Sequence, residues 1–118
     1  MQIEIRNVQG QRFIEGQPGE PLIERVDDIM SVIEADHTVH RLLLYPTNLP
    51  ANFFDLSSGE AGAVLQKLRN YHIRLAVVRT PNLKLSSRFG EMLADEMRGP
   101  YFRLFDERAD AQAWLCAD

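Results

Sequence analysis

The chain has 118 residues, of which 45% are hydrophobic and 25% are charged. This size and balance are those of one ordinary globular domain, and they exclude a disordered chain or a membrane protein. The formal net charge of −4 repels phosphate backbones, so we expect no nucleic-acid partner.

The opening residues and the single cysteine bear on the cellular compartment. Residues 1–6 alternate apolar and polar side chains, which excludes the apolar core of a signal peptide. No apolar run approaches the roughly 20 residues needed to span a bilayer, so no membrane insertion is expected. Cys116 has no second cysteine with which to form an intrachain disulfide, which fits a reducing compartment. We therefore expect a cytoplasmic protein.

The first part of the chain predicts a hairpin, a helix and a buried strand. Residues 2–15 follow an extended pattern on both sides of Gly10, which marks the turn. A helix is predicted from Pro21 to near Asp36, because the apolar residues between them recur on one helical face. Residues 42–45 form a continuous apolar run that a proline stops, which is typical of a strand covered on both faces.

The rest of the chain continues as alternating helices and strands. A second amphipathic helix is marked by Ala61, Val64, Leu65 and Leu68. Residues 73–78 predict a second buried strand, a third helix runs between Leu85 and Met97, and residues 101–105 predict the last strand. Asp106 is a good N-cap for a final helix, which we expect to bury Ala109, Ala113 and Trp114.

This order predicts a single α/β domain over residues 1–118. We expect one compact, mixed and mostly parallel sheet of about five strands, with an N-terminal hairpin and four helices. Strands 42–45 and 73–78 should be adjacent or near-adjacent parallel strands in the interior of the sheet. The predicted core contains Leu43, Leu65, Leu68, Ala76, Val78, Leu93 and Trp114.

The segment 53–60 is the most informative part of the sequence for function. Ser57 lies three residues before Glu60, the capping-box spacing, which would explain the serine by structure alone. The same helix start, with Ser57, Ser58 and Gly59, could instead carry a phosphoryl group or bind an anion. Phe53, Phe54 and Tyr71 could line an apolar pocket beside it, although aromatic residues at these spacings are more often core.

Residues 53–62, followed by Leu65-Gln66-Lys67 and Asn70-Tyr71, resemble the signature of a bacterial family called domain of unknown function 4180. The resemblance extends over residues 20–116 and takes in the closing segments Arg98-Gly99 and Ala113-Trp114-Leu115. Because that family has no assigned activity, the resemblance implies a fold more than a role.

A more distant similarity is to the STAS domain of sulfate transporters and anti-sigma factor antagonists. In that family an Asp-Ser-Ser/Thr-Gly turn opens a helix after a buried strand, and the serine is a phosphorylation switch for a partner kinase. This chain has Leu56 between Asp55 and the serines. The similarity implies a STAS-like fold and, on the Ser-Ser-Gly match alone, Ser57 as the switch residue.

Residue patterns for catalysis, metals and cofactors give no candidate. His37, His40 and His72 stand in no known nucleophile or metalloprotease pattern, and we expect no catalytic residue, no metal site and no cofactor. Basic charge is scattered over the middle of the chain, at Arg69, Arg74, Arg79 and Arg88, where phosphate or carboxylate recognition is conceivable.

Two functional hypotheses follow. The first is a non-enzymatic regulatory or protein-interaction module with a serine switch at a helix N-terminus, which would have a protein partner and is compatible with a homodimer. The alternative is a small-molecule or anion-binding domain, or an undiagnosed enzyme, with its site near loop 46–59.

Overall fold

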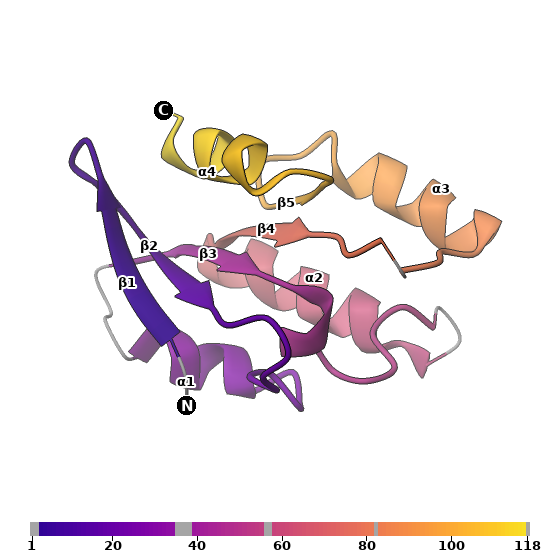
Figure 1. The fold of residues 1–118 in the computed structure, drawn as a ribbon. Coiled ribbons are helices and arrows are strands. Elements are labelled where there is room, and N and C mark those ends of the chain that lie inside the picture. Colours follow the sequence, from indigo (N-terminus) through magenta and orange to yellow (C-terminus); the bar gives the residue numbers. More distant parts are fainter. Residues whose placement is uncertain (1–2, 35–38, 56–57, 82, 118) are drawn as a thin grey trace.

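The computed structural model describes residues 3–34, 39–55, 58–81 and 83–117. Within these residues the chain forms the predicted α/β fold, with one five-stranded mixed sheet and four α-helices (Figure 1). The strands are β1 (Ile3–Val8), β2 (Gln11–Gly16), β3 (Arg41–Leu44), β4 (Arg74–Val78) and β5 (Phe102–Phe105). The helices are α1 (Asp28–Glu34), α2 (Glu60–Tyr71), α3 (Ser87–Glu96) and α4 (Arg108–Cys116), with a 3₁₀ turn η1 (Pro46–Asn48) after β3.

The predicted N-terminal hairpin is confirmed. Strands β1 and β2 pair in antiparallel register, with Val8 opposite Gln11. The two residues between them, Gln9 and Gly10, both have positive φ angles, 52° and 84°. Two-residue hairpin turns of this kind match the right-handed twist of the strands they join. Figure 1 shows the hairpin extending beyond the rest of the sheet.

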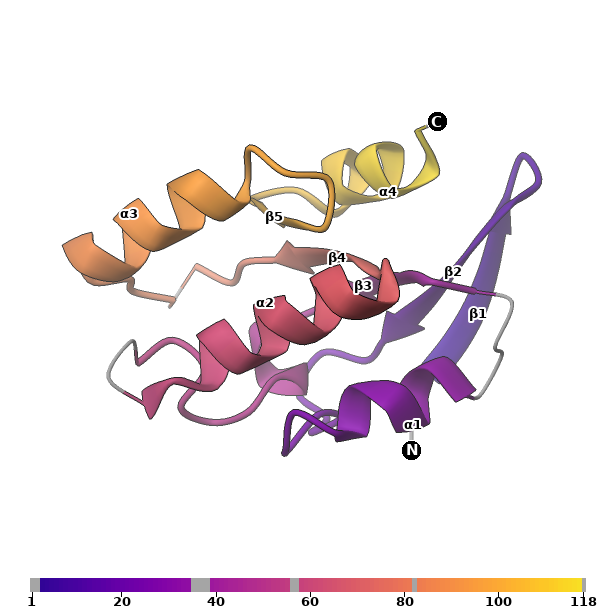
Figure 2. The same cartoon turned by 180° about the vertical axis from the view of Figure 1, so that it is seen from behind.

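The other strands are parallel, and each pairs with the next in the sequence. The strand order is β1-β2-β3-β4-β5, so β3 and β4 are the adjacent interior strands that the sequence predicts. Because every crossover proceeds in the same direction, right-handed connections place α1, α2 and α3 on the same face. Helix α4 follows the last strand and packs on the opposite face (Figure 2).

The sheet has a larger and a smaller core, one on each face. On the first face, buried side chains of α1, α2 and α3 pack against alternate strand residues such as Leu42, Leu44 and Val77. On the second face, α4 packs against Phe13 and Leu43. Six predicted core residues are buried, namely Leu43, Leu65, Leu68, Ala76, Val78 and Leu93. In the described part of the chain, the helices lack the length and apolar character of a bilayer-crossing segment.

Helix α1 begins later than predicted, at Asp28 instead of Pro21. The Asp28 carboxylate oxygen Oδ2 accepts hydrogen bonds from the backbone N–H groups of Glu24 and Arg25, both at 3.0 Å, and so holds the preceding residues in turns. The backbone N–H of Ile23 donates to a carbonyl of η1, at 2.7 Å, instead of joining a helix. The predicted end at Asp36 lies outside the described residues.

The predicted buried face of α4 is wrong. Ala111 and Leu115 are buried, whereas Ala109 and Ala113 are exposed and Trp114 is half-buried. The N-cap position is occupied by Glu107, one residue after the predicted Asp106. The Arg74 guanidinium lies 4.4 Å from the centre of the Trp114 ring. This cation–π contact explains why a large aromatic residue stays at the margin of the smaller core.

Candidate functional site

A cleft of about 740 Å³ lies at the carboxyl-terminal end of the sheet, between the loops that follow β2 and β3. We call it the loop cleft. Its lining is mainly apolar and includes Pro21, Pro46, Leu49, Pro50, Ala51 and Phe54. The strand order of the described sheet has no reversal, so the usual crevice at a topological switch point is missing. The loop cleft depends instead on how the two loops are held together.

Buried Asn48 connects the two walls of the loop cleft. Its side-chain amide Nδ2 donates to the carbonyls of Gln17 and Glu20, at 2.8 and 2.6 Å, and its Oδ1 accepts from the backbone N–H of Tyr45 at 2.8 Å. Its own carbonyl accepts from the backbone N–H of Ile23 at 2.7 Å. One side chain therefore fixes the path of both loops.

Two further contacts tighten this arrangement. The backbone N–H of Gly19 donates to the Thr47 hydroxyl oxygen across the loops, at 2.8 Å. Gly16, the last residue of β2, packs so closely against Asn48 that a Cβ atom there would lie 2.6 Å from Oδ1. A glycine is therefore needed at this position for the approach of the two loops.

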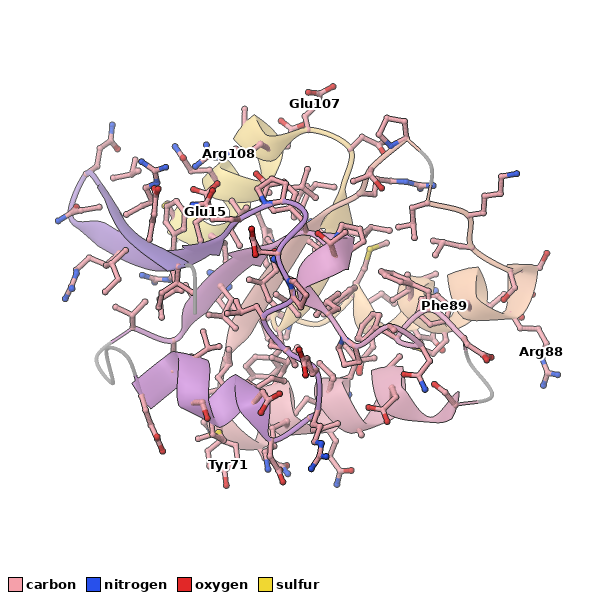
Figure 3. All side chains as sticks on the ribbon, turned by 60° about the horizontal axis from the view of Figure 1, so that its bottom comes forward. Glu15, Tyr71, Arg88, Phe89, Glu107 and Arg108 are labelled. Carbon is pink, nitrogen blue, oxygen red and sulfur yellow. The ribbon has the colours of Figure 1, made fainter. Side chains whose placement is uncertain are left out.

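The predicted aromatic pair lies at the edge of the loop cleft. Phe54 lines the cleft, whereas Phe53 is fully buried behind it, with 4.8 Å between the ring centroids. The Phe54 ring also lies 5.5 Å from that of Phe89, which reaches it from α3 (Figure 3). Tyr71 does not line this cleft. It is 46% exposed at the end of α2, where the Lys67 ammonium lies 5.6 Å from its ring centroid.

The helix start that the sequence singles out differs from a capping box. Helix α2 begins at Glu60, with Gly59 at the N-cap position and a φ angle of 77°, so Glu60 is the first helical residue and not the third. The Ser58 hydroxyl lies within hydrogen-bonding distance of the carbonyls of Asn52 and Asp55, at 2.8 and 2.7 Å, and it accepts from the Glu60 N–H at 3.2 Å. Ser57 lies outside the described residues.

A buried carboxylate lies on the other face of the sheet at the same end. Glu15, only 6% exposed, accepts two hydrogen bonds from the Arg108 guanidinium, at 2.6 and 2.9 Å, and one from Arg6 at 3.2 Å (Figure 3). The Arg108 hydrogen bonds, aided by the charges of Arg108 and Arg6, hold the pKa of Glu15 below its usual value despite burial. This carboxylate is ionised and fully bonded, so it joins α4 to the hairpin and is unsuited to general acid–base catalysis.

The structure describes two of the three histidines. His37 lies outside the described residues, and His40 is exposed just before β3. His72, at the end of α2, has its Nδ1 atom 2.8 Å from the Tyr101 hydroxyl oxygen. Within the described ranges, no three His, Cys, Asp or Glu side chains come together in a way that could hold a metal ion.

The arginines that seem scattered in the sequence have different roles. Arg69 forms a salt bridge with Glu96, and Arg79 Nε lies 3.5 Å from Asp106 Oδ1. Arg88 is exposed on α3. Arg74, the first residue of β4, stands opposite Arg41, the first residue of β3.

Sequence reasoning missed Asn48 because its partners lie about 30 residues away in the chain. The Pro46-Thr47-Asn48 segment is a recognisable turn, in which asparagine commonly bonds its own neighbours. That signal predicts the Tyr45 contact and gives no hint of the bonds to the loop after β2.

The comparisons with known proteins identify a family and leave the role open. The family model for Domain of unknown function (DUF4180) matches residues 8–115. The searches of curated proteins and of solved structures return no match. The STAS-like part of the expectation therefore stays a prediction. Since the match covers nearly the whole sequence, the chain belongs to the DUF4180 family.

Proposed function

We propose that this protein is a binding module whose loop cleft takes a small, mainly apolar molecule that carries an amine. The observation that supports it is the cleft itself. Its volume of about 740 Å³ lies within the usual range of small-molecule sites, and its walls are mostly apolar. It takes up the small-molecule part of the sequence-based alternative, which was a small-molecule or anion-binding domain, or an undiagnosed enzyme, with its site near loop 46–59.

The walls of the loop cleft are pre-formed. Prolines at positions 21, 46 and 50 restrict the backbone, and Asn48 holds the two loops at a fixed separation. A site that is already ordered loses little conformational entropy when a ligand binds, so modest apolar contact suffices for affinity.

Two polar side chains indicate the polar part of the ligand. The Thr47 hydroxyl oxygen accepts from the Gly19 N–H and keeps a second lone pair for an N–H group of the ligand. Glu24 adds a carboxylate to the lining, and the residues lining the cleft include no basic side chain. An amine on an apolar body complements this lining better than a carboxylate does.

A small molecule suits the loop cleft better than a protein partner. Protein interfaces are centred on large exposed apolar anchors. In the described part of the chain, the exposed large hydrophobic residues are Ile5 and Tyr71, and neither lines the cleft. The regulatory hypothesis based on Ser57 stays a prediction. Partner binding by Ser57→Asp, compared with Ser57→Ala, tests it.

A thermal-shift measurement tests the proposal. The probes are phenethylamine and, as the oppositely charged analogue, 3-phenylpropionate. A ligand at one hundred times its dissociation constant adds about 2.7 kcal/mol to stability, or a rise in Tm of about 10 °C for a domain of this size. We expect the larger shift with the amine, and a smaller preference for it in Glu24→Gln.

A matched pair of variants locates the binding. Ala51→Trp places an indole in the loop cleft, whereas Ala63→Trp places one on the exposed surface of α2. The first should abolish the shift and the second should preserve it. Equal shifts in the two variants, or no shift with wild type at any soluble concentration, would overturn the proposal.

A further inference from the structure

A second cavity, of about 380 Å³, lies at the opposite, amino-terminal end of the sheet. We call it the amino-end pocket. It is lined by the basic side chains Arg12, His40, Arg41, His72 and Arg74, and none of its lining residues carries a carboxylate. The whole chain has a net charge of −4, so this concentration of basic groups does not reflect the average composition.

Arg41 and Arg74 are the central pair. They are cross-strand partners in the parallel register of β3 and β4, and so lie side by side on the α4 face. Like charges in such positions destabilise a sheet. Burial, followed by the nearby charges of Arg41 and Arg103, lowers the pKa of Arg74.

Both guanidinium groups are held by their terminal nitrogens. Arg74 donates to the carbonyls of Trp114 and Ala117 at the end of α4, at 2.9 and 3.1 Å, and its guanidinium lies 4.4 Å from the Trp114 ring centroid. Arg41 donates through Nη1 to the side-chain oxygen of Gln11. These contacts fix the two side chains next to each other despite their repulsion.

The Nε–H groups of Arg41 and Arg74 are buried and have no hydrogen-bond partner. Among the described residues, these two Nε atoms are the buried side-chain nitrogen or oxygen atoms that lack a hydrogen-bond partner. A buried donor without an acceptor is costly, and native structures contain few of them. Two in one basic pocket, on adjacent like charges, indicate a missing acceptor that carries negative charge.

We propose that the amino-end pocket binds the phosphoryl group of a small phosphomonoester. A phosphoryl group supplies several strong acceptor oxygens and up to two negative charges, which relieve the repulsion between Arg41 and Arg74 and accept from arginine donors. The cavity is larger than the ion alone requires, which favours an ester over inorganic phosphate. This site is independent of the loop cleft, and either can fail without the other.

His72 gives a second, separate probe of the pocket. It has a φ angle of 54°, in the left-handed region where glycine is the preferred residue at a helix end. Replacing it by glycine removes the imidazole from the pocket and relaxes the backbone. His72→Gly should therefore fold at least as stably as wild type while it binds phosphate less tightly.

Titration calorimetry at neutral pH tests the proposal with phenyl phosphate, inorganic phosphate and phenol as probes. We expect saturable binding of phenyl phosphate, weaker binding of inorganic phosphate and none of phenol. If inorganic phosphate binds as tightly as the ester, the free ion is the source of the phosphoryl chemistry and the ester is contradicted.

The variants are Arg41→Gln and, as a matched control with the same charge change, Arg88→Gln on the exposed surface of α3 (Figure 3). Losing a charge-assisted hydrogen bond should weaken binding on the order of tenfold or more in Arg41→Gln. The control should bind within about twofold of wild type. Melting curves check that each variant folds, and His72→Gly keeps the test decisive if Arg41→Gln does not.

Equal weakening in Arg41→Gln and Arg88→Gln would show a general charge effect and contradict a built site. Absence of saturable binding by either phosphate probe to wild type, or unchanged affinity in both pocket variants, would also overturn the proposal.

Discussion

The two ends of the sheet treat their buried polar groups differently. At the carboxyl-terminal end, Asn48 and Glu15 are buried and extensively hydrogen-bonded. At the amino-terminal end, Arg41 and Arg74 keep buried Nε–H groups without partners. The first arrangement is explained by folding alone, because each polar group has its partner within the chain. The second is incomplete within the described residues and points to something that binds.

The largest effect on stability is expected from removing the Asn48 side chain, which joins the two loops at the carboxyl-terminal end of the sheet. Asn48→Ala deletes three side-chain hydrogen bonds, which removes the acceptor of the Tyr45 N–H and one donor from each of the part-buried contacts with the Gln17 and Glu20 carbonyls. We expect the free energy of unfolding to fall by about 3 kcal/mol, measured by chemical denaturation. Asn52→Ala, in the exposed part of the same connection, should change it by less than about 0.5 kcal/mol.

A double-mutant cycle between Gly16 and Asn48 tests the same connection between the loops. Gly16→Ala alone should be destabilising, because the new Cβ would lie 2.6 Å from Asn48 Oδ1. In the Asn48→Ala background that penalty should shrink, since the obstructing atoms are gone. Strictly additive effects of the two substitutions would contradict the close packing of Gly16 against Asn48.

The next largest loss of stability is expected from neutralising the Glu15 carboxylate. Glu15→Gln removes the charge that Arg108 and Arg6 surround, and we expect a loss of about 2 kcal/mol near neutral pH. This value lies between those of surface and fully buried pairs, because the Arg108 side chain is 39% exposed. Glu4→Gln, on exposed β1, is the control and should lose less than about 0.5 kcal/mol. A similar loss in both variants would contradict a special role for Glu15.

The same carboxylate predicts a pH dependence. Hydrogen bonds from Arg108 place the folded-state pKa of Glu15 below its ordinary value of 4.5. The stabilisation from Glu15 is therefore fully present above pH 4.5 and is lost as the pH falls through the folded-state pKa. The stability difference between wild type and Glu15→Gln, followed by denaturation at decreasing pH, should narrow in that range. A difference that stays constant there would show that Glu15 is not the titrating group.

The smallest stability effect is expected at the other end of the sheet. In phosphate-free buffer, Arg41→Gln should unfold within about 0.5 kcal/mol of wild type, because relief of its repulsion with Arg74 offsets the lost bond to Gln11. A loss as large as that of Glu15→Gln would mean that Arg41 is needed for folding and would remove the contrast between the two ends.

The sequence predicted the fold well where the hydrophobic pattern was unambiguous. Continuous apolar runs gave β3 and β4, and Gly10 gave the hairpin turn. It failed where a single polar contact set an element boundary. The Asp28 carboxylate bonds two preceding amides and delays the start of α1, although the apolar spacing from Pro21 is helical. In α4, Trp114 was predicted to be a core residue, whereas Ala111 and Leu115 are the buried residues of this helix.

Little of the candidate sites could be predicted, because they depend on contacts between distant segments. Phe54, named from the sequence as a candidate pocket residue, lines the loop cleft, but nothing in the local sequence shows that Asn48 bridges to the loop after β2. Arg41 and Arg74 each precede an apolar strand in the sequence. Once those strands are taken as parallel neighbours, the two arginines must lie at the same edge, and this signal was available but unused.

The most direct test of the difference between the two ends is the stabilisation that phenyl phosphate gives to wild type and to Arg41→Gln. At ten times its dissociation constant the ester should add about 1.4 kcal/mol to the stability of wild type. At the same concentration it should add much less to Arg41→Gln. Equal stabilisation of both proteins, or none of either, would contradict the view that the amino-terminal end of the sheet is completed by a phosphoryl ligand.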